Sequence, residues 1–514
     1  MSPDGSVSRS AASLLTSRLA VACIALAFLG VSTRLLTLRE MAVFAVYNIA
    51  CGLLTVVCSL GMLASCVKQV PALRAAGRQG EAARLVRLSA AIYAAGAAAA
   101  TGAAWAAAEP LGRLFLKEEG AAPQVRAAAA AALCFGLYEA VQLLLGSLQR
   151  FARQSRDNVL AALAQRILSL ALFFPFGLHG YLAGFALGSL GGALSGWSVI
   201  RSFLREHRGG ASPRGGTREA VAYAAPLYAD GYLRYLSMHA DQLLVGIVLP
   251  PAALSIYFVA KRCLQYGQML VSSLIDPLAG RAAEMSAADP RGVARLFDAS
   301  LRGVVLLFLP LSVLLACSAP FLLHVIGGEP YAFGATALGL LLLSLPLFAV
   351  FSHLAAFVYI LGRPRDRLAG NLAASLPQLA AMAALAPWLG IAGVAAARSI
   401  GFAAGAVASA RLAAPRLPGA RPWAVLRGAA PALAPSALMG AAILLPYGLT
   451  GEVLLIPPAA AAGALIAAAG YALVVLSPED RGMLARMIPG RGRASRRARE
   501  AVLKGARGRP TGSI

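Results

Sequence analysis

The sequence predicts an all-α protein that crosses a membrane many times. Hydrophobic residues make up 59% of the 514 residues and charged residues only 13%, and the mean hydropathy is +0.71. Apolar runs of about 20 residues, long enough to cross a hydrocarbon core of about 30 Å, recur along the whole chain. Backbone polar groups find no partners in lipid, so such runs form helices. Two pairs of related segments, about 210 residues apart, also indicate an internal repeat.

The apolar runs indicate about fourteen spans by this length rule. The first run is not a cleavable signal peptide, because another span follows it at once. The predicted spans are 14–36, 42–68, 86–108, 125–147, 157–177, 180–203, 221–248, 253–276, 300–326, 332–361, 369–388, 391–411, 429–450 and 453–476.

The repeated segments occupy equivalent places in the two halves of the chain. Arg39 to Tyr47 and Pro250 to Tyr257 each follow one span and open the next. Gly177–Gly180 and Gly390–Gly393 are two-glycine hairpins between spans, each preceded by a segment that begins with asparagine. A duplicated set of spans is typical of transporters whose halves rock around a site at their interface.

The repeat predicts two pseudo-symmetric lobes. We expect an N-lobe at 1–204 with spans one to six, and a C-lobe at 221–411 with spans seven to twelve. A basic, glycine-rich cytoplasmic linker at 205–220 joins them. Residues 412–476 add an interfacial segment and spans thirteen and fourteen, and 477–514 form a basic cytoplasmic tail that anionic lipid attracts.

The distribution of basic residues predicts the orientation of the chain. There are 46 Lys and Arg residues against 22 Asp and Glu, which gives a formal net charge of +24. Alternate loops such as 68–87, 150–156 and 201–218 carry most of them, whereas 177–180 and 387–390 carry none. The positive-inside rule therefore places both termini in the cytoplasm. The charge follows membrane topology and does not indicate a nucleic-acid partner.

Cysteine spacing and loop composition argue against several classes of protein. The seven cysteines lie in predicted spans without CxxC spacing or a His partner, so we expect neither disulfides nor a metal site. The sequence has no G-x-x-x-x-G-K-[ST] loop for ATP hydrolysis. The longest predicted outer loop, around 109–122, offers only Glu109, Glu118 and Glu119. We therefore expect a transporter with no catalytic residues and no cofactor.

Charged residues inside spans are costly and usually functional. Asp230, Arg234 and Asp241 share one face of span seven, and Lys261 belongs to a polar stripe on span eight. Basic candidates outnumber acidic ones, which favours an anionic ligand such as a pyrophosphate headgroup. The other candidates are Arg34, Glu139, Arg166, His239, Arg302, His353 and Arg398.

Several of these groups also have a purely structural interpretation. Asp230 and Arg234 lie one turn apart and form either part of a polar cavity or a tie between helices. Glu139 either couples transport to a proton or cation, or is merely a partner for Arg166. A lone histidine such as His353 more often packs with a hydrogen bond than carries protons.

Eight short segments of the chain are similar to segments of one known family. These are Thr33 to Leu36, Arg39 to Tyr47, Gly61 to Pro71, His239 to Gly246, Ile256-Tyr257, Asp276-Pro277, Gly390 to Gly393 and Pro478 to Arg481. On these segments nearly the whole chain resembles the polysaccharide or O-antigen flippases (Wzx-type) of the multidrug/oligosaccharidyl-lipid/polysaccharide (MOP) superfamily. One departure is that Met41 or Ala42 replaces the usual glycine in the turn before span two. The resemblance implies a MATE-like fold.

The resemblance also implies a function. Such a protein translocates undecaprenyl-pyrophosphate-linked glycan units across the cytoplasmic membrane by alternating access, for polysaccharide biosynthesis, with polymerases or glycosyltransferases as possible partners. An H⁺ or Na⁺ gradient or the membrane potential would drive it. The cationic cavity would consist of Arg34, Arg234, Lys261 and Arg398. Coupling or gating would fall to Asp230, Asp241 and Glu139.

Four other interpretations stay open at this point. One is a non-transporting scaffold with a degenerated cavity, which the retained buried charges disfavour. A lipid II flippase would bind its pyrophosphate headgroup in the same kind of cationic cavity. A cation-coupled multidrug antiporter is disfavoured, because its main buried charges should be carboxylates. A membrane glycosyltransferase or polymerase is disfavoured by the nearly bare outer loops.

Overall fold

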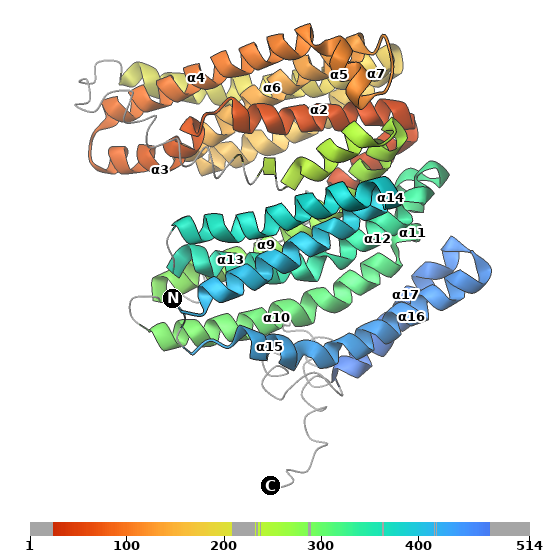
Figure 1. Cartoon of the computed structure of the whole chain (residues 1–514). Coiled ribbons are helices and arrows are strands. Elements are labelled where there is room, and N and C mark those ends of the chain that lie inside the picture. Colours follow the sequence, from red (N-terminus) through yellow and green to blue (C-terminus); the bar gives the residue numbers. More distant parts are fainter. Residues whose placement is uncertain are drawn as a thin grey trace, which may run out of the picture. The chain divides into compact units, whose positions relative to one another are not determined.

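The structure is a computed structural model of the whole chain (Figure 1). Every regular element in the part that it describes is a helix, as the sequence predicts. Nine helices among these residues are long and apolar enough to cross a membrane. The multi-pass, all-α class is therefore confirmed. The structure describes residues 24–207, 232, 235–236, 238–285, 289–361, 364–415, 417 and 419–472.

Contacts divide the chain into two compact units. The first unit contains Ile24–Val259 and Ser375–Ala397, and the second contains Ala260–Ala374 and the residues from Arg398 onwards. The boundaries of the lobes at 1–204 and 221–411 stay a prediction, as does the total of about fourteen spans. The same holds for the cytoplasmic placement of the termini, which lie outside the described residues.

Within each described range, the helices follow one another with short connections. The first half of the chain contains an apolar helix at Ile24–Leu35, α2 (Leu38–Val57), α3 (Met62–Ala75), α4 (Gln79–Ala106), α5 (Ala108–Phe115), α6 (Ala122–Ser147), α7 (Phe151–Glu206) and a short apolar helix at Met238–Val248. The second half contains α9 (Pro251–Met285), α10 (Pro290–Cys317), α11 (Ala319–Gly327), η1 (Glu329–Gly334), α12 (Ala335–Leu343), α13 (Leu345–Leu361), α14 (Pro364–Ala413), α15 (Pro422–Ala429), η2 (Ala430–Ala432), α16 (Leu433–Thr450), η3 (Val453–Leu455) and α17 (Ile456–Gly470).

The second predicted span, 42–68, is interrupted. Helix α2 begins at a capping box, in which the backbone N–H of Thr37 donates to Oε2 of Glu40 over 2.9 Å and the Thr37 hydroxyl oxygen accepts from the Glu40 backbone. It ends at Val57, because Leu60 and Gly61 have φ values of 44° and 73° and cannot continue a right-handed helix. The expected uninterrupted span was therefore wrong.

Both predicted glycine hairpins are present. Helix α7 contains Gly177 with φ 56° and ψ −140°, and α14 contains Gly390 with φ 55° and ψ −134°. Glycine adopts this left-handed conformation without the steric cost that a Cβ imposes. Each glycine folds its helix into two arms, so α7 and α14 each supply two of the predicted spans.

The two arms of α7 pack with their backbones close together. The second arm carries a glycine every fourth residue, and a Cβ at Gly184 or Gly188 would overlap the backbone of Ser169 or Gln165 on the first arm. Small residues four apart allow this approach in lipid, where van der Waals packing drives helix association. The glycines are Gly180, Gly184, Gly188, Gly192 and Gly196.

One helix lies at the centre of each unit. In the first unit α6 packs against α2, α3, α4, α5 and α7, and Figure 1 shows it among these helices. In the second unit α10 packs against α12, α13, α15 and α16. The core around α10 includes Phe297, Leu301, Leu354 and Phe357, all fully buried.

Candidate functional site

Two predicted headgroup-binding cations are deeply buried. Lys261 and Arg398 are each 1% exposed, and both belong to the second unit. Lys261 lies about 15 Å along α9 from its first residue, and Arg398 lies about 12 Å along α14 from Gly390. Arg398 lies within Leu368–Ala413, one of the nine candidate membrane spans among the described residues, whereas α9 is not one of them, so the membrane position of Lys261 stays a prediction from the span 253–276. Cations buried inside membrane spans are usually functional.

Arg398 lies against an aromatic cluster. Its guanidinium carbon is 5.4 Å from the ring centre of Phe402, one turn further along α14. The Phe402 ring in turn contacts Phe348 and Phe351 of α13, with ring centres 5.2 and 6.3 Å away. A cation over an aromatic face is stabilised by about 0.5–2 kcal/mol. The cluster therefore helps to hold the guanidinium in place.

Of the other two predicted cations, one is exposed and one lies outside the described residues. Arg34 is exposed near the end of the helix Ile24–Leu35. Arg234 and its predicted partner Asp230 lie outside the described residues. Their roles in a cavity therefore stay predictions.

Asp241 is fully buried and hydrogen-bonded. The Tyr257 hydroxyl donates to its Oδ2 over 2.8 Å, and the Gln242 backbone N–H donates to its Oδ1 over 2.8 Å. Tyr257 is itself fully buried on α9, so this bond joins the helix Met238–Val248 to α9. Asp241 thus has a structural role, and its role in gating stays a prediction.

Glu139 does not pair with Arg166. Glu139 is half-buried on α6, and no hydrogen bond or ion pair joins it to another described residue. Arg166 instead donates to the Ala162 carbonyl over 2.8 Å and lies 5.7 Å from the ring centre of Phe28. The expected pairing of Glu139 with Arg166 is therefore not present in the structure, and its role in coupling stays a prediction.

Helix α7 carries a polar cluster around buried Asp157 that was not predicted from the sequence. Asp157 is 2% exposed, and its Oδ2 accepts a hydrogen bond of 2.9 Å from Nε of Arg153. Arg153 also donates to Oγ of Ser195 on the opposite arm over 2.7 Å, and Ser195 Oγ lies 3.3 Å from Oδ1 of Asp157. The cluster ties the two arms together. The signal was the spacing of four between Arg153 and Asp157, which places both on one helix face.

His353 has a packing role in the structure. The side chain is fully buried, with Nε2 2.7 Å from Oγ of Ser300. Its ring lies between Phe297 and Phe357, with ring centres 5.1 and 4.8 Å away. Among the described residues, no group of three or more His, Cys, Asp or Glu side chains is arranged to hold a metal ion, and the six described cysteines form no disulfide bond.

Comparisons with known proteins agree with this architecture. A family model described as "Polysaccharide biosynthesis protein" matches residues 31–333. No curated protein sequence matches the chain. The solved structure of a multidrug resistance MATE family transporter of the MOP superfamily, in an inward-facing conformation, has a TM-score of 0.65 at 15% identity, covering 76% of this chain and 95% of that one.

Two further solved structures share the fold. The lipid II flippase MurJ, in an inward closed conformation, has a TM-score of 0.63 at 13% identity, covering 87% of this chain and 98% of that one. A MOP superfamily transporter from Pyrococcus furiosus has a TM-score of 0.50 at 15% identity, covering 76% and 95%. These likenesses confirm the expected MATE-like fold.

Proposed function

Because the chain belongs to the polysaccharide biosynthesis protein family, we propose that it is a transporter for a lipid-linked glycan. It translocates undecaprenyl-pyrophosphate-linked oligosaccharide units across the cytoplasmic membrane by alternating access. The observation that carries this proposal is the burial of Lys261 on α9 and of Arg398 on α14 in a MATE-like fold. Glycosyltransferases would supply the substrate, and a polymerase would use it.

Buried cations suit a pyrophosphate better than a cationic drug. A pyrophosphate carries several negative oxygens, which Lys and Arg side chains bind through charge-assisted hydrogen bonds. Arg presents a rigid fork of donors and Lys a compact point charge, so Lys261 and Arg398 would make different contacts with the headgroup. The glycan would pass with the headgroup while the polyprenyl chain stays in the bilayer. Arg34 and Arg234 are proposed as further contacts on its path.

Glu139 is the carboxylate best suited to energy coupling. It has no ion pair or hydrogen bond with the described residues, so a proton or Na⁺ can bind there without breaking an existing contact. Asp241 would act in gating, because a change in its bond to Tyr257 would free the start of α9. Asp230 is proposed as an additional coupling residue.

A binding experiment separates this function from its rivals. The full chain in detergent is titrated with a polyprenyl-pyrophosphate oligosaccharide, with lipid II and with a cationic drug. We expect the oligosaccharide to bind most tightly, and the Lys261→Met variant to weaken its binding about tenfold or more, because a charge-assisted hydrogen bond is lost. Lys68→Met, which removes an exposed lysine on α3, is the matched control and should bind like the native chain.

The outcomes distinguish the candidate functions. Preference for lipid II over the oligosaccharide would replace the proposal with the lipid II flippase. Tight binding of the drug that is insensitive to Lys261→Met would favour an antiporter. If Lys261→Met and Lys68→Met lose the same amount of affinity for the oligosaccharide, the buried lysine is not a binding residue.

A further inference from the structure

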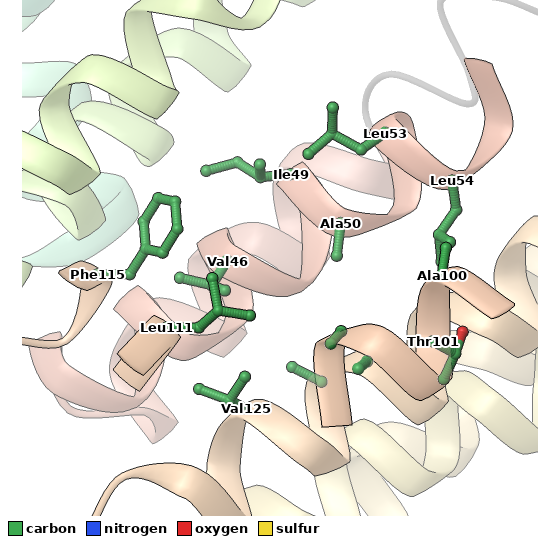
Figure 2. Close-up of a pocket in the computed structure, with 13 residues that line it drawn as sticks. Val46, Ile49, Ala50, Leu53, Leu54, Ala100, Thr101, Leu111, Phe115 and Val125 are labelled. Carbon is green, nitrogen blue, oxygen red and sulfur yellow. The ribbon is translucent and has the colours of Figure 1, made fainter. Parts of the chain in front are cut away.

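An apolar pocket of about 230 Å³ lies within the first unit. Helices α2, α4, α5 and α6 surround it, and Figure 2 shows their side chains directed towards it. It extends along α2 from Val46 to Leu54, a length of about 12 Å at 1.5 Å per residue. The lining residues are Val46, Ile49, Ala50, Leu53, Leu54, Ala100, Thr101, Ala104, Leu111, Phe115, Val125, Ala128 and Ala129.

The lining is suited to a hydrocarbon chain. Thr101 is its one polar side chain, and alanines on three helices leave a narrow space. A sugar or a headgroup would lose its hydrogen bonds to water here without gaining partners. A flexible alkyl chain loses none, and each buried methylene contributes about 0.8 kcal/mol. Val46 and Leu53 are half-buried, so the pocket opens on one side of the unit.

A cation and a tryptophan lie at one end of the pocket. Val125 lines it, and the next residue, Arg126, is the exposed fifth residue of α6 and has no ion pair among the described residues. The indole N–H of Trp105, which follows the lining residue Ala104, donates to the Arg126 carbonyl over 3.1 Å. An exposed tryptophan beside an arginine is typical of the level of lipid headgroups.

The start of α6 leaves this positive charge uncompensated. The first turn of α6 contains no acidic residue, and Ala121 supplies no side-chain cap. The positive end of the helix dipole therefore adds to the charge of Arg126. The acidic residues of the segment before α6 have other partners, since Glu109 and Glu119 lie 3.6 and 3.5 Å from Arg113 and Glu118 pairs with Arg39. An anion at Arg126 would be stabilised by both the dipole and the guanidinium.

We propose that this pocket holds one acyl chain of an anionic phospholipid, with the phosphate at Arg126. The short amphipathic helix α5 covers the chain through Leu111 and Phe115. The bound lipid would stabilise the packing of α2 against α6. The pocket uses none of the residues proposed for transport, so it does not depend on the proposed transport function.

Native mass spectrometry of the full chain tests the proposal. The delipidated protein is incubated with phosphatidylglycerol, with phosphatidylcholine and with a polyprenyl phosphate in turn. Ala104→Phe fills the pocket, and Ala103→Phe, an exposed neighbour on α4, is the matched control. Arg126→Gln removes the headgroup cation, and Arg113→Gln removes an ion-paired one at the same end.

We expect phosphatidylglycerol to stay bound to the native chain and to Ala103→Phe, and to be lost from Ala104→Phe. Arg126→Gln should weaken its binding about fivefold, the effect of one basic residue at a lipid surface, while Arg113→Gln changes it little. Equal retention by Ala104→Phe and Ala103→Phe would overturn the proposal. Preferential retention of the polyprenyl phosphate would overturn the assignment to a phospholipid. A thermal melting curve for each variant identifies any that has lost its fold, and Arg126→Gln then provides an independent test.

Discussion

The close contact between the two arms of α7 predicts opposite effects for two glycines three residues apart. A Cβ at Gly188 would overlap the backbone N and Cα of Gln165, which cannot move without shifting the whole first arm. A Cβ at Gly191 would meet nothing within 4 Å. Both changes to alanine gain the same helix propensity, about 0.8–1 kcal/mol. That gain cancels in the comparison, so the difference between the variants is the overpacking cost, about 1–3 kcal/mol.

Melting temperatures in a single detergent measure this difference. We expect Gly191→Ala to melt at or above the temperature of the native chain and Gly188→Ala to melt below it. Gly192→Ala is a third variant that should resemble Gly188→Ala, because its Cβ would lie 2.7 Å from that of Ala161. If Gly188→Ala and Gly191→Ala melt together, the arms do not pack as described.

Three further changes test contacts in both units. Tyr257→Phe removes a hydrogen bond to buried Asp241 and should lower the stability by about 1.5–3 kcal/mol, measured by thermal unfolding. Ser300→Ala leaves Nε2 of buried His353 without its partner and should cost about 1–3 kcal/mol in the same assay. Cys66, which is fully buried, should not react with maleimide in folded protein when it is the only cysteine left.

Each of these expectations has an outcome that contradicts it. A Tyr257→Phe variant as stable as the native chain would mean that the hydroxyl bond is absent in the folded protein. An unchanged melting temperature for Ser300→Ala would mean that His353 finds another partner. Rapid labelling of Cys66 before heat unfolds the protein would place this thiol at an accessible surface.

The sequence predicted the features that depend on local chemistry. Gly177 and Gly390 each stand between two apolar runs of spanning length, and both adopt the left-handed conformation that closes a hairpin. Lys261 and Arg398 were identified because a charge within such a run has few alternatives to a buried position. The composition of about 20 neighbouring residues is enough to predict these hairpins and buried charges, so distant contacts need not be known.

Features that depend on contacts between distant residues were not predictable in the same way. The burial of Asp157 was not predicted because the residue lies in an arginine-rich segment that resembles a cytoplasmic loop. Its partner Ser195 comes from the other arm of α7. Glu139 and Arg166 were plausible partners by charge, but the Arg166 guanidinium lies against the Phe28 ring. Periodicity shows which residues share a face of one helix, and only packing shows which helix that face meets.

Flipping of a fluorescent polyprenyl-pyrophosphate oligosaccharide in proteoliposomes tests the central claim most directly. The native chain is compared with Arg398→Gln and with Arg411→Gln, which removes an exposed arginine from the last turn of the same helix. The account predicts transport by the native chain and by Arg411→Gln, and a loss of about tenfold or more in folded Arg398→Gln. No transport by the native chain under an imposed ion gradient, or undiminished transport by Arg398→Gln, would contradict it.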